Sequence, residues 1–353
     1  MLSRLHIQNF TVFADAKLEF ANGLNVIIGS NGTGKSHLLK LAYTAARWSQ
    51  ESSKSSQNDK ASLQKRLAEK LTKVFRPDSL GRLARRSADG RQRAEIAVNF
   101  AGHKKRDFVF SFATNNKSDV MLDKPPAEYY TEETVFFPTK EMLSMFPNFT
   151  SLYRDYELSL DETYYDLCLA LERPLLRGPR FQAISKLLDP IEKILNGKIS
   201  VDNGRFYLKQ KGKGEFEIPL VAEGFRKLGT VAYLLANGAL AKQSILFWDE
   251  PETNLNPAYM QDVAKMLVRL AANGTQLFVA THSLFMLREL SLQIAASEHN
   301  NVARCFYALS QGDDGTEISA GKSADDITPI RALEAEIEQS ERYLRETSDS
   351  NKA

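Results

Sequence analysis

The segment from Gly29 to Ser36, GSNGTGKS, has the residue types and spacing of a phosphate-binding loop. It fits G-x-x-x-x-G-K-[ST] at every fixed position, after an apolar run and before a segment with helical spacing. Its glycines let backbone N–H groups turn towards phosphate oxygens, and the following helix start adds partial positive charge. Lys35 can reach the β- and γ-phosphates, and the Ser36 hydroxyl can bind Mg²⁺. The residues expected to contact the phosphates are Gly29, Ser30, Asn31, Gly32, Thr33, Gly34, Lys35, Ser36 and His37.

A second segment, Ser244 to Pro257, places two acids directly after a short apolar run. In an open α/β sheet, ligands bind outside the carboxyl ends of the strands. Asp249 is therefore placed to hold Mg²⁺, and Glu250 to orient and deprotonate an attacking water. The alternative is an acidic pair in a surface turn, which the phosphate-binding loop upstream disfavours.

A third segment, LFVATHS from Leu277 to Ser283, ends an apolar run in a histidine. His282 follows Asp249 by 33 residues. If the two runs are neighbouring strands, His282 lies beside Asp249 and Glu250 and can contact a γ-phosphate or the attacking water. A structural histidine is the alternative.

The elements that would position these residues alternate between strand and helix. Apolar, β-branched runs predict strands, and spacings of three and four predict helices. The expected strands are 24–28, 94–100, 107–113, 135–137, 198–210 (a hairpin), 244–248, 276–280, 302–309 and 317–320, and the expected helices are 35–48, most of 140–195, 222–240, 256–272 and 284–290. Between them, the polar segment 49–62 is expected to be a solvated linker. The alternation predicts an α/β sheet covered on both faces.

Composition excludes several classes of protein. The 353 residues include 46 basic and 44 acidic ones, a formal net charge of +2, and 43% are hydrophobic, as in a globular protein. The two cysteines, Cys168 and Cys305, make no disulfide framework and favour a reducing compartment. No apolar run is long enough to span a bilayer, and the N-terminus lacks a signal peptide pattern, so no membrane association and a cytoplasmic location are expected.

Together the three motifs resemble those of ABC-type ATPase heads, in the branch that includes the SMC proteins, RecF and the OLD nucleases. The opening RLHIQNFTVFADAKLEFANGLNVIIGSNGTGKSHLLK resembles that branch along its length, and DEPETNLNP resembles its DEPE-type Walker B motif and D-loop. The resemblance implies an α/β P-loop NTPase fold with an antiparallel β portion and a helical insertion. It also implies ATP and Mg²⁺ as cofactors and slow ATP hydrolysis. The expected division is a two-part head (1–48 and 198–325), an inserted region (49–197) and an acidic helical or disordered tail (326–353).

The family also implies a signature segment that caps the nucleotide of a partner subunit. VAEGFRK, at 221–227, has the right distance from Asp249, with Gly224 at the glycine position, but Ala222 and Glu223 replace the usual serine and glycine. Gly224 and Asn256, at the D-loop position, are expected to complete the site of a second copy in a homodimer or higher homo-oligomer. A plain helix start is the alternative. After the strand at 135–137, Lys140 is the candidate for coupling the nucleotide to the insertion.

The stretch 82–106 is locally basic, and its partner is open. Its cations could bind DNA or an acidic protein, or form only a solvated face; they are Arg82, Arg85, Arg86, Arg91, Arg93, Lys104, Lys105 and Arg106. For the biological role, the chain resembles the PARIS and Septu ATPases. That resemblance implies a sensor or regulator subunit of an anti-phage defence system that controls a separate nuclease or toxin. The alternatives are a RecF- or SMC-like DNA repair ATPase and an ATP-bound assembly scaffold with little turnover.

Overall fold

The computed structural model describes residues 1–86, 90–156, 158–296 and 300–350. Its central sheet has six strands in the order β14-β13-β3-β12-β11-β7. The parallel strands are β3 (Leu24–Gly29), β7 (Thr134–Phe137), β11 (Ile245–Asp249), β12 (Gln276–Thr281) and β13 (Arg304–Gly312), and the edge strand β14 (Gly315–Gly321) is antiparallel. The four expected strands that carry or flank the motifs, at 24–28, 135–137, 244–248 and 276–280, are thus confirmed, and they lie side by side.

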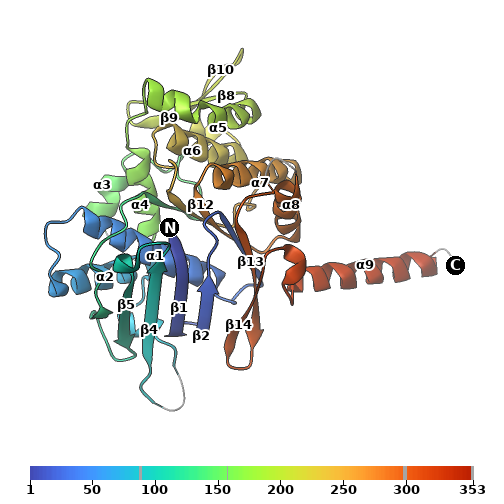
Figure 1. Cartoon of the computed structure of the whole chain (residues 1–353). Helices are drawn as coiled ribbons and strands as arrows, with labels where there is room; N and C mark the ends of the chain where they lie inside the picture. The colour runs from blue at the N-terminus through green and yellow to red at the C-terminus, as the bar shows by residue number, and fades with distance from the viewer. Residues whose placement is uncertain (87–89, 157, 297–299, 351–353) are drawn as a thin grey trace.

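Helices cover both faces of this sheet (Figure 1). Alternate residues of a strand point to opposite faces, so Ile245 and Phe247 pack in one core while Leu246 and Trp248 pack in the other. The first core includes α1 (Lys35–Ser53). The second core includes α6 (Glu223–Ala236), α7 (Pro257–Ala272) and α8 (Leu284–Ala295). Continuous apolar strands are what a sheet buried on both faces requires.

An antiparallel sheet packs over α1 in the order β2-β1-β4-β5-β6. Its strands are β1 (Leu2–Phe10), β2 (Phe13–Glu19), β4 (Arg93–Phe100), β5 (Phe108–Ala113) and β6 (Met121–Lys124). The Gln276 side chain joins this sheet to the central one, because it accepts from the Leu2 N–H at 2.9 Å and donates to the Leu2 carbonyl at 2.7 Å.

A helical region with a small sheet packs at one end of the molecule, over α6 (Figure 1). It contains α3 (Phe149–Asp155), α4 (Glu162–Leu171), α5 (Pro179–Leu195) and an antiparallel sheet of β8 (Gly197–Asp202), β9 (Arg205–Gln210) and β10 (Gly214–Glu217). The expected hairpin at 198–210 is confirmed.

The expected solvated linker at 49–62 is wrong. Helix α1 continues to Ser53, and α2 (Lys60–Phe75) begins after six intervening residues. Polar residues of this segment are buried: Ser49 accepts from the Tyr130 N–H at 2.8 Å, and Gln50 donates to Glu133 at 2.8 Å. These partners lie some 80 residues away in the sequence, so local composition could not reveal them.

The expected inserted region, 49–197, is also not a separate body. Strands β4, β5 and β6 complete the antiparallel sheet that β1 and β2 begin, and β7 extends the central sheet beside β11. We therefore correct the organisation: residues 93–137 are structurally part of the head, and we propose that the inserted region is the helical one, 149–217. The helix expected over most of 140–195 is three helices, the first starting at Phe149.

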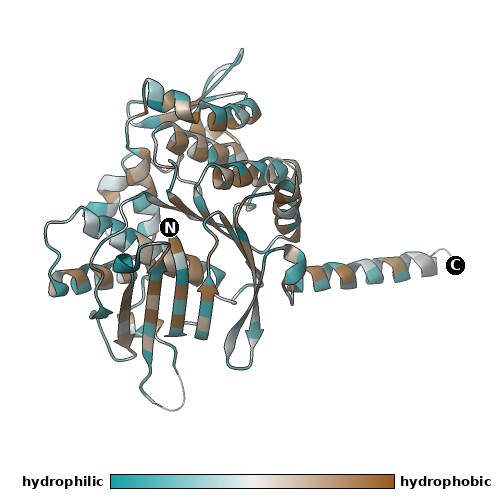
Figure 2. Cartoon of the chain, viewed as in Figure 1, coloured by the Kyte–Doolittle hydropathy of each residue, from teal (hydrophilic) through white to brown (hydrophobic). Residues whose placement is uncertain are grey.

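The C-terminal helix α9 (Arg331–Ser350) confirms the helical tail, and residues 351–353 lie outside the described ones. Figure 1 shows that α9 leaves the body beside α8 and projects away from it. Its hydropathy alternates along its length (Figure 2). Within the described residues, no helix combines the length and apolar character needed to cross a membrane.

Candidate functional site

The phosphate-binding loop joins β3 to α1, as expected. Gly34 caps α1 with a φ of 91°, and a Cβ there would lie 2.5 Å from the Val12 side chain, so only glycine fits. Lys35 is 6% exposed, and its ammonium donates to the carbonyls of Gly29 at 2.7 Å and Ser30 at 3.0 Å. Burial lowers the pKa of Lys35, against the opposing field of Glu250 and neighbouring acids.

The other residues of the loop divide between its surface and its support. Ser30, Asn31 and Gly32 are exposed. Thr33 is buried; its hydroxyl donates to the Ser30 carbonyl at 2.8 Å. His37 is exposed one turn into α1, with its ring 5.9 Å from that of Phe75. The loop thus presents a free rim, while Thr33 and Lys35 hold its shape from inside.

Asp249 lies at the carboxyl end of β11, next to the loop. Its pKa is raised because it is buried, while a hydrogen bond with Ser36 and the charges of Lys40 and Lys35 partly oppose this. The Asp249 Oδ1 atom is buried without a hydrogen-bond partner. A hydroxyl beside a carboxylate with an unpartnered oxygen fits Mg²⁺, which takes oxygen ligands and keeps several waters. No group of three or more His, Cys, Asp or Glu in the described ranges could hold a metal, so any site here has few protein ligands.

Glu250 and His282 meet at the ends of β11 and β12. The His282 Nδ1 atom lies 3.2 Å from Glu250 Oε1, and half of the His282 side chain is exposed. Glu250 adopts a φ of 52°, an uncommon conformation for a non-glycine residue, and its N–H donates to the Ala280 carbonyl at 2.9 Å. The two expected neighbours are therefore brought together, and the backbone of the adjacent strand fixes Glu250.

Glu252 is a site residue that the sequence reasoning missed. It is 4% exposed, and its Oε1 atom accepts from the Thr281 hydroxyl at 2.5 Å and from the His282 N–H at 3.1 Å. The same oxygen lies 3.5 Å from His282 Nδ1, and Oε2 is buried without a hydrogen-bond partner. Glu252 thus ties the end of β12 to the turn after β11. Its only signal was its place in the DEPE motif.

The two residues expected to serve a partner's site lie on adjoining segments. The start of α6 packs on the turn 254–256: a Cβ on Gly224 would lie 2.6 Å from the Leu255 side chain, and Asn254 donates to Glu223 at 3.0 Å. Asn256 caps α7 by accepting from the Ala258 N–H at 3.0 Å. Among the described residues, no hydrogen bond joins Gly224 or Asn256 to the phosphate-binding loop.

Lys140 is exposed, and in the described ranges no ion pair or side-chain hydrogen bond joins its side chain to a second element. Its backbone is hydrogen-bonded to Tyr164 of α4. Its neighbour Glu141 makes such a contact, since its side chain is 6% exposed and accepts from Arg226 of α6 at 2.7 Å. On the same helix, Lys227 is buried, and burial lowers its pKa; it donates to the Thr253 carbonyl at 2.6 Å. The strand-end segment after β7 is therefore joined to α6 by Glu141.

The basic stretch does not form one surface. Arg82, Arg85, Arg86, Arg91 and Arg93 precede or begin β4, whereas Lys104, Lys105 and Arg106 follow its other end. With residues 87–89 left aside, four of the eight pair with acids: Arg82 with Asp78, Arg85 with Asp314, Arg93 with Asp123 and Lys105 with Glu128, at 2.7 to 3.1 Å. The stretch is thus two separated clusters, each partly neutralised.

Short segments of curated DNA repair proteins match this chain. It is 61% identical to DNA repair protein RecN of Aquifex aeolicus over 36 residues and 48% identical to DNA replication and repair protein RecF of Shewanella loihica over 42 residues. It is 44% identical to the DNA double-strand break repair Rad50 ATPase of Archaeoglobus fulgidus over 45 residues. These matches cover 10%, 12% and 13% of this chain and 7%, 12% and 5% of the three relatives.

Solved SMC heads share the fold along nearly the whole chain. An SMC head bound to the C-winged helix domain of ScpA has a TM-score of 0.58 at 15% identity, covering 92% of this chain and 98% of that one. An SMC head with an extended coiled coil, bound to the C-terminal domain of ScpA derived from Pyrococcus furiosus, has a TM-score of 0.50 at 11% identity, covering 98% and 99%. These likenesses establish an ABC-type head fold.

The model of a family described as "AAA domain, putative AbiEii toxin, Type IV TA system" matches residues 44–288, more than two thirds of the chain. The matched range contains Asp249, Glu250 and His282, and the phosphate-binding loop lies just before it. The chain therefore belongs to this AAA-domain family and is an ABC-type ATPase of the SMC and RecF kind.

Proposed function

We propose that this chain hydrolyses ATP to ADP and phosphate in the presence of Mg²⁺. The observation that carries the proposal is the meeting of Lys35, Ser36, Asp249, Glu250 and His282 at the ends of three adjacent strands. A pure nucleotide binder has no need of an acid and a histidine in contact beyond the phosphate-binding loop.

Each side chain then has a role set by its position. Loop N–H groups hold the phosphates, and the Lys35 ammonium, which donates to two loop carbonyls, transfers its hydrogen bonds to the β- and γ-phosphates. Glu250 takes a proton from the attacking water. The water oxygen bonds to the γ-phosphorus while the bond between the γ-phosphorus and the ADP oxygen breaks. His282, held by Glu250 and Glu252, contacts the γ-phosphate.

Ser36 and Asp249 would hold Mg²⁺, because their side chains are hydrogen-bonded to each other and the Asp249 Oδ1 atom is buried without a hydrogen-bond partner. When bound, Mg²⁺ neutralises negative charge that develops on the phosphates. Gly224 and Asn256 would complete the site of a second copy, which makes a homodimer or a larger homo-oligomer part of the proposal. Gly224 and the turn at 254–256 pack together and would reach a partner as one unit.

Phosphate release tests the hydrolysis proposal directly. We expect Glu250→Gln to lower kcat at least 100-fold, the range for loss of a general base, with ATP affinity changed less than threefold. Lys35→Ala should abolish ATP binding instead. The matched control is Glu132→Gln, at an exposed site. Wild-type turnover that survives Glu250→Gln unchanged would assign the chemistry to another group, and no turnover in any chain would favour the ATP-bound scaffold.

For the biological role, we propose a sensor or regulator subunit of an anti-phage defence system that controls a separate nuclease or toxin. The support is the family description, which names a toxin and a toxin–antitoxin system. Expression together with the neighbouring genes should lower phage plating at least tenfold, and Lys35→Ala should remove that protection. Equal plating with both chains would refute the proposal.

A DNA repair ATPase is the second candidate, favoured by the short matches to RecN, RecF and Rad50. Those matches span at most 12% of each relative's length. This candidate requires tight binding of double-stranded DNA through the cations at 82–106. The division of those cations into two partly paired clusters weakens it.

A further inference from the structure

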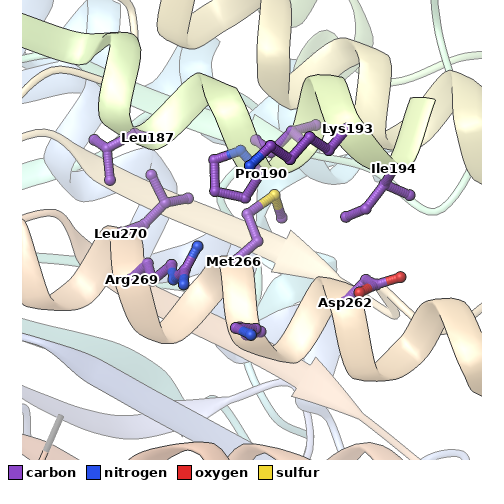
Figure 3. A pocket seen from close by; sticks show the side chains of 10 residues that line it. Leu187, Pro190, Lys193, Ile194, Asp262, Met266, Arg269 and Leu270 are labelled. Atoms are coloured by element: carbon purple, nitrogen blue, oxygen red, sulfur yellow. The ribbon is translucent and has the colours of Figure 1, made fainter. Parts of the chain in front are cut away.

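A groove with an apolar floor and a basic rim runs between α5 and α7, away from the residues assigned above. Its volume is about 300 Å³, and Figure 3 shows side chains of both helices facing it. The apolar residues that line it are Leu187, Pro190, Ile191, Ile194, Met266 and Leu270. Lys193, Lys265 and Arg269 stand on the rim against one acid, Asp262. The lining therefore carries a net charge of 3 − 1 = +2.

The basic character continues beyond the end of α5. A second hollow lies between the end of α5 and strands β8 and β9. It shares Lys193 with the groove and adds three lysines, Lys198, Lys209 and Lys211, against two acids, Asp189 and Glu192. Lys198 pairs with Glu192 and Lys209 with Glu215, while Lys193, Lys211 and Lys265 have no acid within 4 Å in the described chain. The surface around the groove thus attracts an acidic partner.

The chain itself carries an acidic helix with an uncovered apolar stripe. In α9, the apolar residues Leu333, Ile337 and Leu344 share one face, with the small polar residue Ser340 between the last two. Ile337 is 50% exposed and Leu344 is 65% exposed. The first turn of α9 packs on the body, and Glu336 pairs with Arg288 of α8 at 3.4 Å. Residues 331–347 include five glutamates and three arginines, a net charge of −2.

We propose that α9 of one copy docks in the α5–α7 groove of a second copy. The apolar stripe would cover the apolar floor. The acids beside the stripe, Glu336 and Glu341, would face the basic rim and exchange their pairs with Arg288 and Arg345 of their own chain for it. Helix α9 spans about 30 Å and helices α5 and α7 about 25 Å each, and a two-fold arrangement would use the contact twice. Pairing of α9 with α9 is disfavoured because two net-negative helices would face each other. This contact is independent of ATP.

Cross-linking of mixed chains tests the proposal. Ile337→Cys is made in one chain and Ile194→Cys in another, both with Cys305→Ser, since Cys305 is half-buried and Cys168 is buried. The chains are mixed in EDTA without nucleotide and treated with a short bis-maleimide. We expect a product of twice the chain mass in the mixture and little in either chain alone.

Three other outcomes would overturn the proposal. A product from Ile337→Cys alone would mean that α9 pairs with α9. A doubly substituted chain that reacts only within itself would mean that the groove takes its own helix. The absence of any product would mean that α9 is not docked. The same cross-linking can be done with Lys35→Ala in every chain, which removes ATP binding from the experiment. A failure to cross-link therefore says nothing against ATP hydrolysis, and a failure to hydrolyse ATP says nothing against docking of α9.

Charge reversal supplies a second readout. Lys265→Glu with Arg269→Glu should raise the dimer Kd in sedimentation at least tenfold, and Glu336→Lys with Glu341→Lys on the partner should restore at least part of the affinity. Lys117→Glu, on an exposed loop remote from α9 in sequence, is the matched control and should leave Kd within twofold. Reversal without any change in Kd would contradict the basic rim as the docking site.

Discussion

Glu252 holds the two strand ends that carry Glu250 and His282. One carboxylate oxygen accepts from both the Thr281 hydroxyl and the His282 N–H, and the side chain is almost fully buried. It does not face the solvent from which a substrate would bind. Its effect on the chemistry would therefore pass through His282, which makes it a positioning residue.

We predict that Glu252→Ala lowers kcat for ATP about tenfold or more while KM changes less than threefold, because His282 loses its backbone anchor and the loop that binds phosphate is unaffected. Glu252→Gln keeps one carbonyl acceptor and should recover much of kcat. The measurement is steady-state phosphate release with circular dichroism to confirm folding. A change confined to KM would contradict a positioning role.

The pKa of Asp249 links Mg²⁺ binding to pH. Burial raises the pKa of this carboxyl, so its protonated fraction grows at a higher pH than for an exposed aspartate. A protonated carboxyl is a poor Mg²⁺ ligand.

We predict that Mg²⁺-dependent ATP binding weakens as pH falls through the raised pKa of Asp249. The Asp249→Asn chain should lose this pH dependence along with most Mg²⁺ affinity. Titration of Mg²⁺ against a fluorescent ATP analogue at several pH values checks this. An unchanged pH profile in Asp249→Asn would assign the titration to another group.

The phosphate-binding loop and the acids Asp249 and Glu250 could be predicted from the sequence, because binding of phosphate and Mg²⁺ requires particular residue types at fixed spacing. The contact of Glu250 with His282 followed from two strands and their ends. Glu252 could not be assigned in the same way, because its role depends on which strand lies beside β11, and only the sheet order supplies that. Glu141 could not be recognised as the coupling residue in place of Lys140 for the same reason, because the partner of Glu141, Arg226, is 85 residues away in the sequence.

At the scale of elements, a buried charge network joins α1, α2 and α4. Asp166 accepts from Tyr43 at 2.5 Å and pairs with Lys70 at 2.8 Å and Arg47 at 3.2 Å. Lys70 also pairs with Glu51 at 3.0 Å. Helix α1 starts at the phosphate-binding loop, so this network fixes that helix against its neighbours. It also explains why the polar end of α1 is structured.

We predict that Asp166→Asn lowers the free energy of unfolding by about 3 to 5 kcal/mol, the cost of leaving buried cations without their partner. Burial raises the pKa of Asp166, but the attraction of Lys70 and Arg47 outweighs it and the net shift is downward. The stabilisation is therefore present above the ordinary value of 3.8 and is lost as pH falls through the lowered pKa. Urea unfolding at neutral pH measures the difference.

The control lies on the exposed face of α2. Lys65 and Glu69 are 4.0 Å apart with 79% and 51% of their side chains exposed, so Glu69→Gln should change stability by less than about 0.5 kcal/mol. A similar loss in both variants would show that the network contributes no more than a surface pair. The prediction of a linker at 49–62 was wrong for a related reason. Polar residues of this segment bind partners far away in the sequence, and the spacing of apolar residues does not reveal such partners.

At the scale of the whole molecule, the cations at 82–106 separate to the two ends of β4. Eight residues of strand span about 25 Å, so one cluster is far from the other. We predict weak binding of double-stranded DNA, with a salt slope for log K below about 3, because few unpaired cations can meet phosphates at once. Fluorescence anisotropy across a salt series measures it. A slope near 6 or more would revive the DNA repair candidate.

ATP-driven association is the property on which the proposed switch depends, and this chain departs from the family there. Ala222 and Glu223 stand where the resemblance implies serine and glycine. Gly224 nevertheless packs on the turn that carries Asn256, so the surface that we propose caps a partner's nucleotide forms one unit. In this unit Lys227 is buried and anchored on the Thr253 carbonyl, and Arg226 pairs with Glu141.

We predict that ATP with Mg²⁺ raises the mass measured by light scattering, and that Glu250→Gln holds the larger species, because the trapped nucleotide is not hydrolysed. Gly224→Asp should prevent the increase, since a side chain there collides with Leu255 and adds a charge beside the partner's phosphates. Ile337→Asp isolates the contact through α9: it should lower the mass without nucleotide and leave the ATP-dependent step. If the mass of Glu250→Gln is the same with and without ATP, association does not depend on the nucleotide. Control of an effector must then act through a conformational change within one chain. The Glu141–Arg226 pair, which joins the segment after β7 to α6, is the nearest connection for such a change.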